Sequence, residues 1–175
     1  SDSDGRARAV TAPAPLVIKL GGATVDYAHA MPDLWRTLGS LHDAGRAMSG
    51  GNAGIAIVHG GGAAVDRLLG SLGLPVVRHE GLRVTPADQI DHVVSVLAGS
   101  VNATLVGALA AAGGRPVGLS LADGDLTTAE AISESLGRVG RVTGGDPALV
   151  HALWRAGFLP VVSSIGADAG GAPLN

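Results

Sequence analysis

Cysteine is absent from the 175-residue chain, and lysine occurs once, at position 19. The lack of cysteine excludes disulfides, thiolate catalysis and cysteine-bound metals, and it fits a reducing cytosol. Aromatic residues make up only 2% of the chain and the net charge is −3. A nucleic-acid-binding surface is basic and usually offers aromatic rings for stacking. We therefore expect no nucleic-acid partner.

Long apolar runs are also missing, since none approaches the roughly 18 residues that a membrane span needs. The first 15 residues lack the apolar centre of a signal peptide and mix Ala, Pro, Asp and Arg. Hydrophobic residues nevertheless make up 46% of the chain, enough for a large aliphatic core. We expect residues 1–15 to be a flexible tail and residues 16–175 to form one soluble, cytoplasmic unit without a membrane partner.

Short apolar runs alternate with longer helical patterns after the tail, which is typical of α/β proteins with a parallel sheet. The strands are expected at residues 16–20, 55–58, 116–119 and 158–165. A helix over about 31–44 would place Leu34, Leu38 and Leu41 on one face. The predicted fold is an open, mainly parallel sheet flanked by helices, an αβα sandwich.

Residues 75–85 predict a β-hairpin, because Glu80-Gly81 separates two β-rich runs and glycine accepts a positive φ. Thr85 then resembles a helix cap, with Pro86 in the first helical position. The helix that follows keeps apolar spacing as far as about residue 112. Its apolar face is wider than one sheet face needs, so it is either a subunit interface or fully buried. Residues 127–145 are irregular, with a second hairpin as one reading.

The stretch LVIKLGG, residues 16–22, places Lys19 inside an apolar run that ends in Gly21 and Gly22. A charge there is costly unless an anion meets it, although lysines in apolar runs are commonly edge or snorkelling residues. The second run, IAIVHGGG, also ends in glycines. Ligands bind at the carboxyl ends of parallel strands, where glycines let backbone N–H groups approach an anion. The two clusters together indicate an anion site.

Three familiar glycine motifs do not fit. A Walker P-loop needs its lysine after the glycines, but Lys19 precedes them. The dinucleotide fingerprint would need glycine where Val65 stands. The HGGG at 59–62 is found in esterases, which also need a G-x-S-x-G elbow, and the nearest segment, GLSLA at 118–122, lacks the second glycine.

Taken in order, LVIKLGG, IVHGGG, GLRVTPADQID, LAGSVNATLV, VTGGDPAL and FLPVVSSIG resemble the acetylglutamate kinases of the amino acid kinase family. The resemblance runs from about residue 16 to residue 175. It implies phosphorylation of the side-chain carboxylate of N-acetyl-L-glutamate by MgATP, in arginine biosynthesis. It also implies that the hairpin at 75–85 acts as a lid over the substrate.

The resemblance assigns roles to seven residues. It makes Lys19 the catalytic lysine that neutralises the transferring phosphoryl group. The other six are Gly21 and Gly22 for the ATP phosphates and Gly61, Gly62, Arg83 and Asn175 for the substrate, with Arg83 gripping the α-carboxylate. His59 is expected to be structural, and Asp123 and Asp125 to be turn residues. No residue is assigned to a metal.

Members of this family continue well beyond the position of Asn175, with further catalytic residues and the adenine pocket. The chain is therefore expected to be the N-terminal, acyl-amino-acid-binding half, incompetent as a kinase alone, with ATP and Mg²⁺ bound mainly through the absent C-terminal half. A homodimer through the 86–112 helix is expected. The alternatives are a non-catalytic acetylglutamate-binding, dimerising module and a kinase for a related substrate such as N-acetylaminoadipate.

Overall fold

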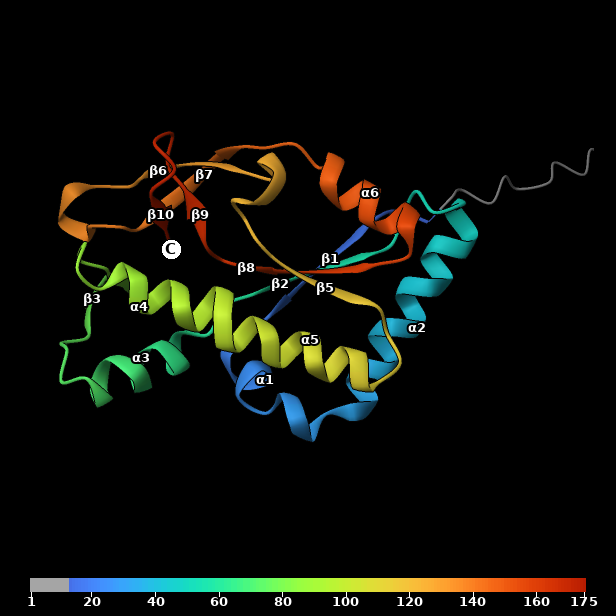
Figure 1. Cartoon of the computed structure of the whole chain (residues 1–175), viewed down its shortest axis with the longest axis horizontal. Helices are drawn as coiled ribbons and strands as arrows, with labels where there is room; N and C mark the ends of the chain where they lie inside the picture. The colour runs from blue at the N-terminus through green and yellow to red at the C-terminus, as the bar shows by residue number, and fades with distance from the viewer. Residues whose placement is uncertain (1–12) are drawn as a thin grey trace, which may run out of the picture.

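The computed structural model describes residues 13–175 and centres on a four-stranded sheet in the order β1-β2-β8-β5 (Figure 1). The neighbouring strands are all parallel. Their bounds are Leu16–Leu20 for β1, Ile55–His59 for β2, Leu159–Ser163 for β8 and Pro116–Ser120 for β5. The predicted parallel α/β sheet is confirmed, whereas residues 1–12 of the expected tail lie outside the described residues.

Helices cover both faces of the sheet and make three layers (Figure 1). One face carries a long continuous helix made of α4 (Ile90–Val94), the π-helical segment η2 (Ser95–Val101) and α5 (Asn102–Ala111). Around it lie α1 (Gly22–Asp26), α2 (Pro32–Ser49) and α3 (Gly62–Ser71). The other face carries α6 (Ala148–Ala156). The single-turn 3₁₀ helices are η1 (Ala28–Ala30), η3 (Asp123–Asp125) and η4 (Glu134–Leu136).

Successive side chains of a strand point to opposite faces of the sheet, so the core is divided into two clusters, one on each face. Leu20, Ile57 and Val161 face the long helix and belong to the main buried cluster. Ala56, one residue from Ile57, faces α6 and packs in a smaller cluster with Trp154. The core is thus built mainly from aliphatic side chains of the strands and of the long helix, with Trp35 buried in the main cluster and Trp154 in the smaller one.

The long helix, Ile90–Ala111, spans 22 residues and is long and apolar enough to cross a membrane by length and composition. The expectation that no apolar run approaches the length of a membrane span is therefore wrong for this helix, although the helix itself was predicted. In the fold the helix lies across the sheet, where Leu105 and Leu109 are fully buried in the main cluster. That is the environment of a core helix, and the absence of a membrane partner remains a prediction.

Three antiparallel pairs extend beyond the carboxyl end of the sheet (Figure 1). They are β3 (Val77–His79) with β4 (Leu82–Val84), β6 (Thr128–Ala131) with β7 (Gly140–Gly144), and β9 (Gly166–Ala167) with β10 (Pro173–Leu174). The first hairpin turns at Glu80 and Gly81, whose φ values are 49° and 84°. Both predicted hairpins are confirmed. The expected strand at 158–165 is β8, and the short β9–β10 pair follows it.

The helix start at Thr85 is wrong, because α4 begins at Ile90 and no side chain caps it. The backbone of Thr85 is occupied elsewhere, since its N–H donates to Leu136 O (3.0 Å) and its carbonyl accepts from Arg138 N (2.7 Å). The predicted apolar face of the earlier helix is right for Leu34 and Leu38, which pack in the main cluster, but wrong for Leu41. Leu38 is buried as expected, but Leu41 is 52% exposed.

Candidate functional site

The two glycine clusters lie side by side, as the sequence predicts. The register of β1 with β2 pairs Leu20 with His59, so Gly21 and Gly60 follow neighbouring strand ends. An ideal Cβ placed on Gly21 or Gly22 would meet no atom within 4 Å. Open space therefore lies over this backbone, which is what an approaching phosphate group needs.

Lys19 lies two residues before this bend and its side chain is exposed. Ile18 and Leu20 on either side pack with the main core, so Lys19 projects from the opposite face of the sheet. Val17 and Val58 on that face line an apolar hollow of about 310 Å³ beneath α6. Among residues 13–175, no carboxylate lies within ion-pair distance of Lys19. The ammonium is thus available to an anionic ligand rather than committed to an internal pair.

Gly61 and Gly62 form the start of α3, a ten-residue helix that begins at the carboxyl end of β2. No acceptor within the described chain takes a hydrogen bond from either N–H group. Gly61 is buried against the long helix, because a Cβ there would lie 3.0 Å from Leu97 Cδ2 and 3.2 Å from Val101 Cγ2. A helix start with free N–H groups favours negative charge.

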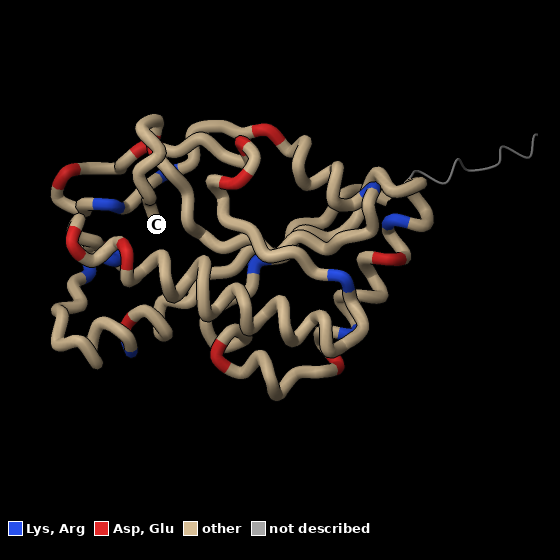
Figure 2. Tube along the Cα trace, viewed as in Figure 1, with Lys and Arg blue, Asp and Glu red and all other residues tan. Residues whose placement is uncertain are grey.

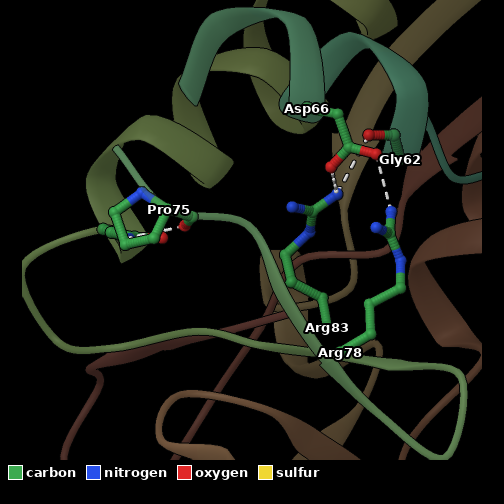
Figure 3. A network of polar contacts seen from close by, with 6 residues as sticks. Gly62, Asp66, Pro75, Arg78 and Arg83 are labelled. Carbon is green, nitrogen blue, oxygen red and sulfur yellow. Dashed lines mark hydrogen bonds and ion pairs between the residues drawn. The ribbon is translucent and has the colours of Figure 1, made fainter. Parts of the chain in front are cut away.

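Arg83 reaches this helix start from β4 (Figure 3). Its Nη2 donates to Gly62 O at 3.0 Å and to the carboxylate of Asp66. The side chain is only 9% exposed. Its other terminal nitrogen, Nη1, is buried and has no partner within the described chain. A charged donor left unpaired in a buried place is costly, so this nitrogen is suited to a ligand acceptor.

Asp66 is the residue that the sequence analysis missed. Its carboxylate accepts from Arg83 and, at 2.6 Å, from Arg78 Nη2, and these arginines are register partners across the β3–β4 hairpin (Figure 3). Partial burial alone would raise the pKa of Asp66, but hydrogen bonds and charges from both arginines outweigh it and lower the pKa. Asp66 lies one helical turn after Gly62, yet nothing in the sequence links that turn to the hairpin.

Asn175 is connected to Thr85 through the chain segment around Arg138, which hydrogen-bonds both residues. Its N–H donates to Arg138 O at 3.0 Å, and Arg138 N donates in turn to Thr85 O at 2.7 Å. Arg138 also donates to Pro173 O and to Asp168, at 2.9 and 2.8 Å, which fixes the chain before Asn175. The Oδ1 of Asn175 is buried without a partner.

Five buried side-chain atoms have no hydrogen-bond partner within residues 13–175, and two of them belong to Arg83 and Asn175. The other three are His42 Nε2, Thr85 Oγ1 and Ser163 Oγ. Thr85 follows Arg83 by two residues and Ser163 ends β8 beside His59. Unpaired buried polar atoms are rare and call for an explanation, and four of these five gather near the carboxyl end of the sheet.

His59 is a hydrogen-bonded residue at a strand end, as expected, and is only 1% exposed. Asp123 and Asp125 lie in the turn η3, also as expected. Basic and acidic residues are interspersed along the described chain (Figure 2). Among residues 13–175, no group of three or more His, Asp or Glu side chains is arranged to hold a metal ion.

The family model described as amino acid kinase family matches residues 14–175. The chain belongs to the amino acid kinase family.

The curated relatives include acetylglutamate kinases from Pectobacterium atrosepticum, Actinobacillus succinogenes and Vibrio parahaemolyticus, at 47%, 45% and 44% identity. The matches cover 92–93% of this chain. The chain spans only about 60% of the length of these relatives.

Solved structures agree on the fold. The structure of smu.665 from Streptococcus mutans UA159 matches with a TM-score of 0.71 at 26% identity, covering 91% of this chain and 62% of its own. N-acetylglutamate synthase from Neisseria gonorrhoeae, complexed with coenzyme A and N-acetyl-glutamate, matches with a TM-score of 0.68 at 21% identity, covering 93% and 36%.

Proposed function

We propose that this chain is the acyl-amino-acid-binding half of an acetylglutamate kinase. The complete enzyme transfers the γ-phosphoryl group of ATP to a side-chain carboxylate oxygen of N-acetyl-L-glutamate, in arginine biosynthesis in the cytoplasm. The relatives that cover this chain at 44–47% identity carry that name. The single observation that supports the substrate half most is the buried, unpaired Nη1 of Arg83.

Arg83 binds the substrate α-carboxylate in this proposal. Its Nη2 is anchored on Gly62 O and on Asp66, while Nη1 remains free. The anchors hold the guanidinium plane before the ligand arrives, so little rotational entropy is lost on binding. The side-chain amide of Asn175, tied to Arg138 through its backbone N–H, binds the polar groups near the α-carbon.

The glycine bends and Lys19 serve the phosphoryl group. The free N–H groups of Gly61 and Gly62 at the start of α3 stabilise the negative oxygens during transfer. Gly21 and Gly22 leave room for the ATP phosphates, and Lys19 supplies a mobile positive charge from the end of β1. ATP brings Mg²⁺ and the reactive phosphoryl group, and both are bound mainly by a C-terminal half.

We propose that the C-terminal half of the complete enzyme extends the sheet beside β1. Leu16 and Val17 on this edge strand are 48% and 65% exposed, and β1 pairs only with β2 within the described chain. An exposed apolar strand edge is normally covered by another element. The relatives are longer than this chain, so a segment of the complete enzyme can supply that cover.

Two finer points complete the proposal. The β3–β4 hairpin acts as the lid over the substrate, and the ion pairs of its two arginines with Asp66 connect it to α3. The complete enzyme is a homodimer through the long helix, because exposed small residues repeat along its open side every four residues, at Ser95, Gly99, Ala103 and Gly107.

The experiment compares this chain with a chain extended to the full length of its relatives. The extended chain should form ADP in the presence of N-acetyl-L-glutamate, and the 175-residue chain should bind the substrate calorimetrically without turnover. ADP formation by the 175-residue chain would contradict the proposal that this chain binds the substrate but needs the C-terminal half for phosphoryl transfer. If the extended chain also binds without turnover, the non-catalytic module is favoured, and a preference for N-acetylaminoadipate would reassign the substrate.

A further inference from the structure

His59 is buried at the end of β2, and both of its ring nitrogens have partners. Its Nε2 lies 3.0 Å from Asn102 Nδ2, and its Nδ1 lies 2.9 Å from Gly60 O. Asn102 is 5% exposed and starts α5, directly after the π-helical segment. The imidazole therefore connects the long helix to the glycine loop.

The direction of these hydrogen bonds follows from Asn102. Its Nδ2 also lies 2.9 Å from the carbonyl oxygen of Val161, which only accepts, so this end of the side chain must be the NH₂ group. The NH₂ group then donates to His59 Nε2 as well. Nε2 is consequently unprotonated, and the proton of the neutral ring is on Nδ1, where it donates to Gly60 O.

The hydrogen bond to Gly60 sets the direction of an N–H group of the site. The carbonyl of Gly60 and the N–H of Gly61 belong to one trans peptide unit, so they point in opposite directions. Because the carbonyl is held toward the buried imidazole, the Gly61 N–H is directed away from it. That N–H has no acceptor within residues 13–175.

Packing by β5 and by the π-helical segment also holds the Asn102 amide and the glycine loop in place. Gly118 on β5 leaves room for the Asn102 amide, since a Cβ there would lie 2.1 Å from Asn102 Oδ1. Leu97 and Val101 of the π-helical segment press on Gly61. π-Helical turns are costly and occur frequently at functional sites.

We propose that His59, in its neutral Nδ1-protonated form set by Asn102, is a positioning residue that aims the Gly61 N–H at the ligand. This inference rests on the proposed function, which makes that N–H part of the substrate and phosphoryl site. Burial keeps the ring neutral by lowering the pKa of His59, although its hydrogen bond to Gly60 acts in the opposite sense. The long helix thereby contacts the glycine loop through the hydrogen bond of Asn102 to His59, in addition to the packing of Leu97 and Val101 on Gly61.

Two substitutions of His59 test the roles of its two ring nitrogens separately. In His59→Asn the amide NH₂ occupies the place of Nδ1 and keeps the donor to Gly60, whereas in His59→Gln the amide reaches the place of Nε2 and loses that donor. Calorimetry with N-acetyl-L-glutamate should show about tenfold weaker binding for His59→Gln, the loss of one hydrogen bond, and a change within about threefold for His59→Asn. Melting temperatures report the stability of both variants.

A merely structural His59 would make affinity follow the melting temperature, and equal affinities of the two variants would overturn the inference. NMR on the unsubstituted chain supplies a second measurement that needs no ligand. The ¹⁵N spectrum of the ring should show protonated Nδ1 and unprotonated Nε2, and the opposite tautomer would overturn the inference. If the unsubstituted chain binds no acetylglutamate, the proposed function fails, and the tautomer alone decides the role of His59.

Discussion

The guanidinium of Arg83 donates through Nη2 to the carboxylate of Asp66. Asp66 therefore acts as an internal carboxylate that orients the arginine, while the buried Nη1 is left for a ligand. The contact joins the β3–β4 hairpin to the helix that begins at the glycine loop (Figure 3).

Replacing Arg83 by lysine should weaken N-acetyl-L-glutamate binding by about 10- to 100-fold, since a charged hydrogen bond contributes roughly 1.5–3 kcal/mol. An ammonium cannot contact Gly62, Asp66 and a ligand carboxylate with the geometry of a guanidinium. Arg78→Lys is the matched control, because the Arg78 side chain is 46% exposed and its hydrogen bonds within residues 13–175 go to Asp66 alone. Calorimetric affinities that fall equally in both variants would argue against a direct ligand contact by Arg83.

The Asp66 pairs should give the hairpin a stability that depends on pH. The pKa of Asp66 is lowered in the folded chain, so its contribution is complete above the unfolded value of about 3.9 and is lost as the pH falls through the folded value. Asp66→Asn should remove this dependence. Hydrogen exchange of residues 77–84 against pH measures it, and an acid dependence that persists in Asp66→Asn would contradict the assignment.

Lys19→Ala in the full-length enzyme should lower kcat by at least about 100-fold and leave the KM for acetylglutamate nearly unchanged. The reason is that Lys19 lies near the glycine bends on the sheet face away from the main core and pairs with none of the described carboxylates. Lys19→Arg should not restore the rate, because a bulkier guanidinium displaces the phosphoryl group. Normal turnover with a large rise in KM would contradict a catalytic role.

His42 should make the whole chain less stable in mild acid. Its Nδ1 accepts the Ile55 N–H at 3.1 Å, and burial lowers its pKa against the opposing influence of Asp43. A histidine with a lowered pKa stabilises the fold fully above the unfolded value of about 6.5, and stability falls as the pH drops below it. His59, whose pKa is also lowered, acts in the same direction.

His42→Asn keeps an acceptor near Ile55 but cannot take up the proton, so it should flatten the slope of unfolding free energy between about pH 5 and pH 7. Denaturant unfolding at several pH values measures the slope. The control is His29→Asn, since His29 is exposed. An unchanged slope in His42→Asn would leave His59 as the main source of the pH dependence and contradict this prediction.

The dimer proposed for the long helix is tested by Ala103→Glu, which places a charge among its exposed small residues. The full-length enzyme should become monomeric in sedimentation while keeping its melting transition. Ala44→Glu on α2 is the control, because Ala44 is also exposed. A dimer that survives Ala103→Glu would place the interface elsewhere.

Much of the fold could be read from the sequence because the signals are local. Glu80-Gly81 specifies a tight turn by its φ preference, and the apolar runs specify buried strands. The start of the long helix could not be read, because tertiary hydrogen bonds with Leu136 and Arg138 hold the backbone of Thr85 away from a cap. The π-helical segment, which fits Gly61 against Leu97, likewise depends on packing rather than on local preference.

For the candidate site as well, local signals could be read from the sequence and tertiary contacts could not. The side-by-side glycine clusters follow from strand-end geometry, whereas a role for Arg83 in the site was expected only from the family resemblance. Asp66 was missed, because its role depends on a helix meeting a hairpin across many residues of chain. The long helix itself was predicted, but its membrane-like mean hydropathy was not, since small residues dilute its apolar run.

The most direct test of the central claim is an amide NMR titration of the chain with N-acetyl-L-glutamate. The account predicts that the backbone signals of Gly61 and Gly62 and the side-chain signals of Arg83 and Asn175 shift together along one saturating curve. Shifts confined to the apolar hollow beneath α6, or no saturable shift at all, would contradict it.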